Sequence, residues 1–526
     1  MGPLYYFNNT VYWLEGRPRE GGRNVLCRYH PHPPPSSDNN NDNNDEVAGS
    51  SRISDVTPPT ANVRSRVHEY GGGAVIFGSG GNNGRKDNHD GGDIYYTEFT
   101  TQQICRLVDE DCGSIPITIA AGDDDTTSSS TTTTNNNYRY ADGVLSSNGK
   151  YIYCIREDHT IPTNVINEIV CIDIDSSSSS ISGGGGTTGK TTIIATGNDF
   201  YSHPRLSPND NNQLIYITWN HPAMPWDNTE LRKIDNLSSL LSEEEDDEKK
   251  EKKLSLTKYH TLIAGNIDNN DDDDQEGTSI LQPSFHPITG ELYYISDESG
   301  YYNIYKQRQT NNNNNNNNKG VSVLPMSYDF GGPSPGWVLG QQGYTFMTDG
   351  RLVAQYSKDG KSILVIANVM TKDDNNDGAA TNICEYIGGR DDNILPITFG
   401  GIVTSTTTNN DGSIYFLGGS PSTPTSIYRW DSTNPTLPAR IIKCSSNVQF
   451  SSSIISTPRR IEFPTSNNKT AFGYYYPPRN DGYACTADDD DDVKSLPPLL
   501  VKAHGGPTSC TSCSYNAAIQ SWLCNT

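Results

Sequence analysis

The stretch PSFHPITGELYYISDE, residues 283–298, places a tight turn between two strand-like runs. Thr289-Gly290 supplies the turn, because glycine tolerates the positive φ that tight hairpin turns require. After the turn, residues 292–296 have the composition of a β-strand, with apolar and aromatic side chains in succession. This run-turn-strand unit predicts one β-hairpin of a larger sheet.

The same unit recurs along the chain. Other copies read GVLSSNGKYIYCIRED (143–158), PRLSPNDNNQLIYITWN (204–220), YTFMTDGRLVAQYS (344–357) and STTTNNDGSIYFLGG (405–419). In the first of these, Tyr151, Tyr153 and Ile155 alternate with Ile152, Cys154 and Arg156, which is typical of a pleated strand covered on both faces. Several copies are followed by one more strand-like run: EIVCIDID, YYNIYKQ and SIYRWD.

The spacing of the repeat predicts the fold class. Gly350 follows Gly290 by 60 residues, and Gly412 follows Gly350 by 62. One small sheet cannot bury both of its faces, whereas sheets stacked radially can, so the repeat favours a mainly β protein built as a β-propeller. We predict about seven blades, with six or eight as alternatives, starting near Val11, His68, Tyr140, Tyr201, Ile280, Tyr344 and Ile394. A pair of β-sandwiches is the rival fold, and it would not be expected to show this repeat.

Low-complexity runs account for the unusual composition and charge. Only 33% of the 526 residues are apolar and the net charge is −24. The excess of acidic residues lies in short runs at 38–46, 123–125, 243–253, 268–276, 373–377 and 488–492. We interpret these runs as disordered insertions in surface loops, because they bury too little apolar surface to offset chain entropy. The remaining chain is close to neutral, so nucleic-acid binding, which would need a basic face, is not expected.

Targeting and redox features favour the cytoplasm. The N-terminus, MGPLYYFNNTVYWLEGRP, lacks the pattern of a signal peptide, and no apolar run is long enough to span a bilayer. The 11 cysteines are scattered, as expected for reduced thiols. Cys510 and Cys513 form a single C-x-x-C, which without a second pair is more simply chance spacing than zinc or redox chemistry. We expect no metal, no cofactor and no membrane partner.

The sequence pattern changes near residue 455. Blade-type turns end there, and strands are predicted around Arg460–Phe463 and Ala471–Tyr475. The apolar run at 499–501, bounded by turns, suits a central strand of an α/β sheet. We therefore predict a propeller over residues 1–455 and the first strands of an α/β-hydrolase domain over residues 456–526.

Nine segments resemble one family of enzymes. In order, they are VYWLEGRPREGGRNVL, RVHEYGGGA, RYADGVLSSNGKYIYCIREDH, FYSHPRLSP, ITWNHPAMPWDNTEL, QPSFHPITGELYYISDESGYYNIY, FGGPSPGWVLGQQGYTFM, IEFPTSNNKTAFGYYYPP and LLVKAHGGPTS. Together they resemble the acylaminoacyl-peptidase and dipeptidyl-peptidase-like branch of the prolyl oligopeptidase family of serine peptidases. The resemblance covers essentially the whole chain outside the insertions. It implies a propeller capping an α/β-hydrolase domain, with the active site between them.

The resemblance implies catalytic groups that residues 1–526 do not contain. The family carries a serine on a G-x-S-x-G elbow, followed by an aspartate and a histidine. GGSPS at Gly418 lacks the second glycine, and GPSPG at 332–336, which has both glycines, lies among the blade repeats and before the HGGP loop. We expect the family pattern to continue beyond this sequence, which is truncated before the catalytic serine.

The HGGP loop at 504–507 is the one part of the implied catalytic apparatus that the sequence holds. Gly506 corresponds to the glycine whose N–H holds the oxyanion, and Gly505 lets the backbone approach the reacting carbonyl. From the residues alone, a tight turn at a strand end explains the loop equally well. His504 is not expected to act as the general base, because the family's base lies much further along the chain; we expect it to be buried in support of the turn.

Other polar residues have two interpretations. Glu69 and Glu157 could face the central cavity and bind a substrate amine, as acidic propeller residues do in dipeptidyl relatives, although solvated or packing roles are the simpler expectation. The histidines at 68, 203, 221 and 286 show no clustering typical of metal ligands.

The function implied by the resemblance is a serine-type peptidase that cleaves short peptides through an acyl-enzyme, with residues 1–526 alone inactive. The alternative is a non-catalytic propeller that binds a protein or peptide. A periplasmic TolB-like propeller is disfavoured by the HGGP segment and the absent signal sequence.

Overall fold

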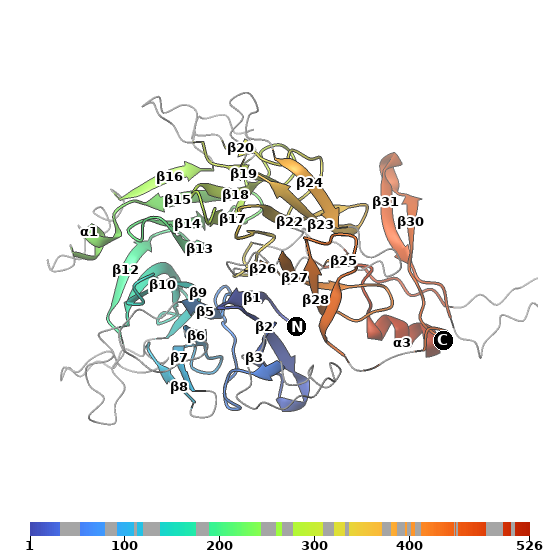
Figure 1. Ribbon diagram of the computed structural model, residues 1–526, viewed down its shortest axis with the longest axis horizontal. Helices are drawn as coiled ribbons and strands as arrows, with labels where there is room; N and C mark the ends of the chain where they lie inside the picture. Colours follow the sequence, from blue (N-terminus) through green and yellow to red (C-terminus); the bar gives the residue numbers. More distant parts are fainter. Residues whose placement is uncertain are drawn as a thin grey trace, which may run out of the picture.

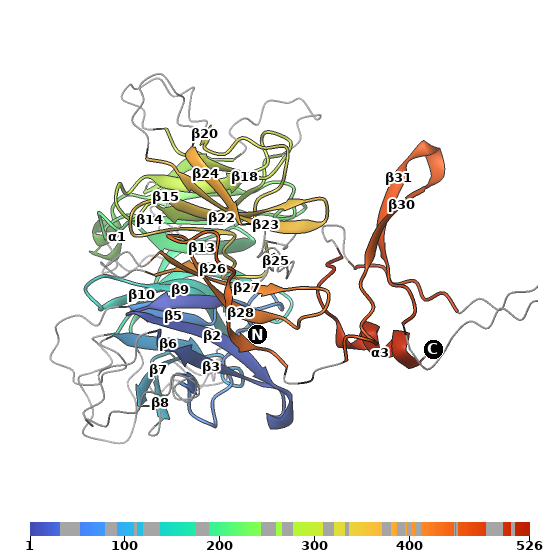
Figure 2. The ribbon, with the colours of Figure 1, turned by 45° about the vertical axis from the view of Figure 1, so that its right-hand side comes forward.

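Seven β-sheets form a ring, and a hairpin and a helix stand beside it (Figures 1 and 2). The computed structural model describes residues 1–31, 53–78, 92–109, 113–118, 137–174, 189–242, 259–265, 277–308, 320–331, 336–370, 380–386, 395–396, 401–405, 412–446, 448, 451–479, 498–505 and 511–525.

The first four sheets are antiparallel and have four strands each. Their strands are β1 Leu4–Phe7, β2 Thr10–Arg17, β3 Arg23–Tyr29 and β4 Ile53–Asp55; β5 Val75–Gly78, β6 Asp93–Thr97, β7 Ile104–Asp109 and β8 Gly113–Pro116; β9 Tyr138–Leu145, β10 Tyr151–Asp158, β11 Ile166–Asp173 and β12 Thr191–Thr196; and β13 Phe200–Leu206, β14 Leu214–Trp219, β15 Glu230–Ile234 and β16 His260–Ala264. A short helix, α1 Leu237–Ser242, follows β15.

The remaining three sheets repeat this plan, and the last has a fifth strand. Their strands are β17 Ile280–Phe285, β18 Leu292–Ser296, β19 Asn303–Lys306 and β20 Val321–Ser322; β21 Tyr344–Phe346, β22 Leu352–Lys358, β23 Lys361–Asn368 and β24 Thr381–Tyr386; and β25 Leu395–Pro396, β26 Ile402–Thr404, β27 Ser413–Gly419, β28 Ser426–Asp431 and β29 Arg440–Cys444. In the seventh sheet, β25 and β26 both pair with β27.

Each sheet is covered on both faces, as the run of apolar residues in β10 predicts. Ile152 packs with residues of the second sheet, and Tyr153 packs with residues of the fourth. Successive side chains of a strand point to opposite faces, so an unbroken apolar run serves two neighbouring cores. The described residues contain seven such cores, one between each pair of adjacent sheets.

Side-chain packing closes the ring between the first and seventh sheets. Leu4 and Trp13 of the first sheet share a core with Tyr415 and Leu417 of the seventh. Among the described strands, none pairs β1–β4 with β25–β29. Closure therefore depends on this core rather than on a shared strand.

The structure confirms the mainly β propeller with seven blades and adjusts some of its boundaries. The fifth and sixth sheets begin at Ile280 and Tyr344, as predicted. The first begins at Leu4, one strand before Val11, because the four-residue strand LYYF precedes the first turn. The second begins at Val75, since His68 lies in the loop that leads into β5.

The C-terminal part agrees with the sequence at its hairpin and differs at residues 499–501. Strands β30 Arg459–Pro464 and β31 Thr470–Tyr475 pair antiparallel, as expected. Leu499–Val501 form no strand; Leu499 is 80% exposed. An apolar run needs a partner strand to complete its hydrogen bonds, and no described strand lies alongside it. The predicted boundary near residue 455 falls between β29 and β30 and stays a prediction.

Helix α3 Ala517–Asn525 is fixed to the chain that leaves the ring. The Gln520 side-chain amide accepts from the Ser456 N–H at 2.8 Å and donates to the Ser456 carbonyl at 3.0 Å. Both residues are buried. No described helix is long and apolar enough to cross a membrane.

Candidate functional site

One end of the ring carries both the C-terminal part and a cluster of polar residues. The first strands of the sheets line the axis, since β5 contacts β9, β9 contacts β13 and β1 contacts β26. In an antiparallel sheet the start of the first strand lies beside the turn between the second and third, as the pairing of Asp158 with both Tyr138 and Ile166 shows. We call this end of the ring the hairpin-side face.

The C-terminal part contacts this face at two of those turns. Tyr474 of β31 donates its hydroxyl hydrogen to the Gly360 carbonyl, in the β22–β23 turn, at 2.8 Å. The Tyr515 N–H donates to the Ser420 carbonyl, after β27, at 2.9 Å. Groups on the hairpin-side face are therefore on the same side of the ring as the chain that carries the HGGP loop.

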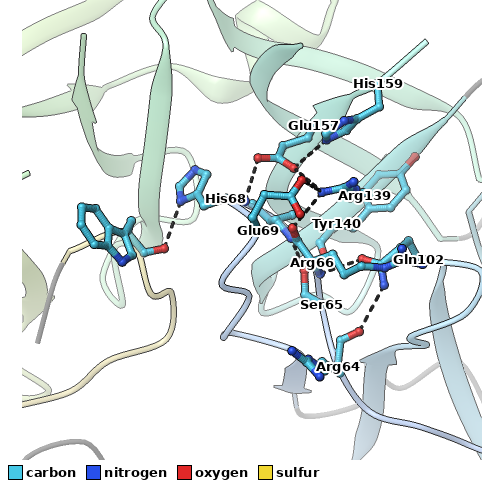
Figure 3. A network of polar contacts seen from close by, with 12 residues as sticks. Arg64, Ser65, Arg66, His68, Glu69, Gln102, Arg139, Tyr140, Glu157 and His159 are labelled. Carbon is cyan, nitrogen blue, oxygen red and sulfur yellow. Dashed lines mark hydrogen bonds and ion pairs between the residues drawn. The ribbon is translucent and has the colours of Figure 1, made fainter. Parts of the chain in front are cut away.

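Two glutamates lie against one arginine on the hairpin-side face (Figure 3). Arg139, in β9, donates through Nη1 to Glu69 Oε1 at 2.6 Å, and the same nitrogen lies 3.8 Å from Glu157 Oε2. Glu157, in β10, also accepts from the His68 N–H at 2.7 Å and lies 2.9 Å from His159 Nε2. The loop before the second sheet is thereby joined to the third sheet.

The two carboxylates differ in burial. Glu69 has a side chain that is 71% exposed, and its hydrogen bond from Arg139 lowers its pKa. Glu157 has a side chain that is 5% exposed, and its described partners surround it. Because a buried carboxylate needs such partners, Glu157 has the packing role expected from the sequence, whereas Glu69 presents a carboxylate to solvent.

The backbone between Val67 and Ala74 holds Glu69 in place. His68 and Glu69 have φ of +55° and +62°, which L-residues adopt rarely. A Cβ on Gly72 would lie 2.1 Å from the Leu339 carbonyl oxygen, and one on Gly73 would lie 2.8 Å from the Asp142 backbone. The glycines of the EYGGG stretch are therefore required for the loop to pack against two neighbouring segments.

A small cavity lies at the axis of the ring. Its volume is about 230 Å³, and it is lined by residues of the first strands of several sheets, among them Tyr5, Tyr6, Phe77, Thr345 and Thr404. Burial raises the pKa of the Tyr5 hydroxyl, so this phenol is neutral at physiological pH.

The predicted oxyanion residues are only partly described. Gly506 and Cys510 lie outside the described residues. Gly505 and His504 are exposed, and His504 Nδ1 lies 3.3 Å from the Gly505 carbonyl oxygen. The expectation that His504 is buried was wrong, because residues 498–505 form no strand against which the loop could pack.

The remaining histidines do not gather into a site. Burial lowers the pKa of His203 to about 4, and His286 is buried with Nε2 2.9 Å from the Gly350 carbonyl oxygen. His221 is paired with Asp199 at 3.1 Å. In the described part of the chain, no three His, Cys, Asp or Glu side chains are placed to hold a metal ion.

Sequence reasoning missed Arg139 and His159 as members of the cluster. Both lie in RYADGVLSSNGKYIYCIREDH, one of the segments that carry the family resemblance, and RVHEYGGGA is another. The structure brings these two segments together on the hairpin-side face (Figure 3). The signal available in the sequence was that both segments carry the resemblance; that they meet is seen only in the structure.

The fold is shared with solved structures of peptidases. A puromycin-hydrolysing peptidase of Mycobacterium tuberculosis matches 99% of this chain at 22% identity and a TM-score of 0.70. A puromycin hydrolase matches 99% of the chain at 20% identity and a TM-score of 0.71. This chain has their fold. It spans 64% of the length of each of these two proteins. No family model matches the sequence, and neither does any curated protein.

Proposed function

We propose that this chain is the propeller-bearing part of a serine peptidase of the prolyl oligopeptidase family that cleaves short peptides through an acyl-enzyme. The observation that carries the proposal is the match of 99% of the chain to a puromycin-hydrolysing peptidase, with a TM-score of 0.70. The nine segments quoted from the sequence support the same family independently, because they depend on residue identity rather than on backbone shape.

The chemistry divides between this chain and groups that it does not contain. In such a peptidase a serine hydroxyl attacks the peptide carbonyl while a histidine takes its proton, and water then hydrolyses the acyl-enzyme. The one G-x-S-x-G in residues 1–526 is GPSPG at 332–336, which lies between β20 and β21 in the sequence and not after the HGGP loop, where the family carries its elbow. We therefore expect residues 1–526 alone to be inactive. Their catalytic contribution is the Gly506 N–H, directed at the oxyanion, with Gly505 allowing close approach of the backbone.

The propeller contributes substrate selection. By its position beside the proposed active site, the ring would limit access to short peptides. We propose that the Glu69 carboxylate binds the substrate's amino group. Its carboxylate is exposed on the hairpin-side face, where it can accept a hydrogen bond from a further donor beside Arg139. Glu157 holds Glu69 in place indirectly, because it accepts a hydrogen bond from the His68 N–H and lies near Arg139.

The reading frame beyond codon 526 tests the proposal. A G-x-S-x-G elbow, followed by an aspartate and a histidine in frame, is the expected result. A stop codon at this point, in cells where the protein is abundant, would favour the non-catalytic peptide-binding propeller. If the frame continues, a Gly506→Pro variant of the complete enzyme should lose about 10²- to 10³-fold in kcat, because proline removes the N–H.

The same experiment has a control in the chain itself. Residues 1–526, purified and incubated with aminoacyl and dipeptidyl chromogenic substrates, should give no turnover above buffer. Turnover that disappears on changing Gly506 would contradict the assignment of the nucleophile to a segment beyond residue 526.

A further inference from the structure

The residue that follows Glu69 in the sequence has an aromatic side chain that lies open to solvent on a fixed support. Tyr70 is 62% exposed, and its ring stacks on Trp337 with centroids 5.3 Å apart and planes 21° apart. Trp337 is in turn held edge-on by Trp226, at 4.8 Å and 67°. One face of the Tyr70 ring is covered by Trp337, so its exposed surface lies on the other face.

The support beneath Tyr70 is rigid. The Gly71 carbonyl accepts from the Leu339 N–H at 3.0 Å, and Gly72 forms a parallel bridge with Leu339. His68 Nδ1 lies 3.1 Å from the Trp337 carbonyl oxygen. Contacts on both sides of Tyr70 therefore join its loop to the segment that carries Trp337, and the stack is formed before any ligand arrives.

The cost of this arrangement points to a role in binding. Left-handed backbone at His68 and Glu69 is strained, and strain of this kind is retained at sites where the geometry is used. The strained residues place Glu69 and Tyr70, consecutive in sequence, on the hairpin-side face, with the Glu69 carboxylate against Arg139 and the Tyr70 ring against Trp337. A stacked ring with one open face favours a second flat ring, offset or edge-on.

We propose that Tyr70 is a specificity-determining residue whose open face stacks on an aromatic side chain at the amino-terminal end of the substrate. The inference rests on the proposed function, because it takes the ligand to be a short peptide whose amino group lies at Glu69. An ammonium group and the side chain of the same residue are adjacent in a peptide, as Glu69 and Tyr70 are adjacent in the loop.

Calorimetry on the 526-residue protein tests the inference without needing turnover. The probes are phenylalanylglycinamide, alanylglycinamide and N-acetyl-phenylalanylglycinamide. An aromatic pair of this kind corresponds to a preference of about 2- to 12-fold in Kd for the phenylalanyl over the alanyl probe. In Tyr70→Ala the ratio of the two dissociation constants should fall to about 1, while the Kd of the alanyl probe stays within about twofold.

Two variants control for loss of structure and for unspecific effects. Tyr70→Phe keeps the ring and should keep the preference. Tyr301→Ala removes another exposed tyrosine, outside the Trp337 stack, and should also keep it. Because Tyr70 is exposed, neither of its substitutions removes a core side chain.

Each outcome separates the inference from the proposed function. If both free peptides bind and Tyr70→Ala leaves their ratio unchanged, the aromatic stack is wrong while peptide binding stands. If the acetylated probe binds as tightly as the free one and depends on Tyr70, the stack is right and the amine assignment of Glu69 is wrong. If no probe binds, the peptide site and the stack are both overturned, although an in-frame catalytic triad would still support the peptidase.

Discussion

Replacing Glu157 with alanine should destabilise the protein far more than the same change at Glu69, although both carboxylates lie against Arg139. Glu157 accepts the His68 N–H at 2.7 Å and lies 2.9 Å from His159, with a side chain that is 5% exposed. Glu69 has a hydrogen bond from Arg139 at 2.6 Å, but its side chain is largely in water. Distance to the arginine favours Glu69 as the stronger contact, and burial favours Glu157.

Burial decides the magnitude. Glu157→Ala leaves the buried His68 N–H without an acceptor, at about 1–3 kcal/mol, and removes a carboxylate beside Arg139, whose own side chain is 15% exposed. Arg139 keeps its hydrogen bond to Glu69, so the larger additional loss is the contact with His159, at about 0.5–1.5 kcal/mol. The exposed pair of Glu69 and Arg139 contributes only about 0.2–1 kcal/mol. We expect the two variants to differ by about 2 kcal/mol.

Urea unfolding followed by far-UV circular dichroism measures this difference. Glu157→Gln should lie between the two, because its amide oxygen still accepts the His68 N–H while the charge is lost. Equal losses of unfolding free energy for the Glu157→Ala and Glu69→Ala variants would refute the reasoning. So would a loss below about 1 kcal/mol for Glu157→Ala, because it would mean that water reaches Glu157 in solution.

Three further perturbations test the ring, the helix and a buried histidine. Trp13→Ala empties part of the core that closes the ring and should lower the free energy of unfolding in urea by about 3–5 kcal/mol. It should also be cleaved by protease earlier than Trp430→Ala, because Trp430 lies in a core between two sheets that the chain itself links. Gln520→Ala leaves the buried Ser456 N–H and carbonyl without partners, so hydrogen exchange in α3 should accelerate at least tenfold. Burial lowers the pKa of His203 to about 4, below its value in the unfolded chain, so the unfolded chain binds more protons between these two values. The free energy of unfolding should therefore fall as the pH drops from about 6.5 to 4. Urea titrations at each pH should show a smaller fall for His203→Asn.

The ring could be predicted from the sequence because each blade carries its own local signal. Turns such as Asn148-Gly149 and the apolar strands beside them repeat at nearly even spacing, and only radial stacking satisfies so many two-faced sheets. The errors came where local chemistry differs from the repeat. The loop 67–74 replaces the expected strand start at His68, since its three glycines adopt left-handed backbone to pass close to Leu339 and Asp142.

Only part of the candidate site could be predicted from the sequence. Glu69 and Glu157 stood out as acidic residues in blade segments, but their burial, which separates an exposed carboxylate from a structural one, depends on contacts between sheets. Arg139 lies 70 residues from Glu69 and reaches it only because the second and third sheets are adjacent in the ring. Trp337 is further still along the chain, and nothing local to Tyr70 predicts the stack.

The run at 499–501 shows the limit of apolarity as a signal. Three apolar residues between turns predict a buried strand, yet Leu499 and its two neighbours are exposed, and β30 and β31 expose Ile461, Phe463 and Phe472. These side chains are not part of the seven cores between the sheets of the ring. A sheet face buries its apolar residues only against a second layer, and among the described residues Phe463 and Phe472 stay 46% and 59% exposed. Apolarity therefore shows which residues can be buried, whereas the presence of a neighbouring layer decides whether they are, and that layer cannot be read from the run itself.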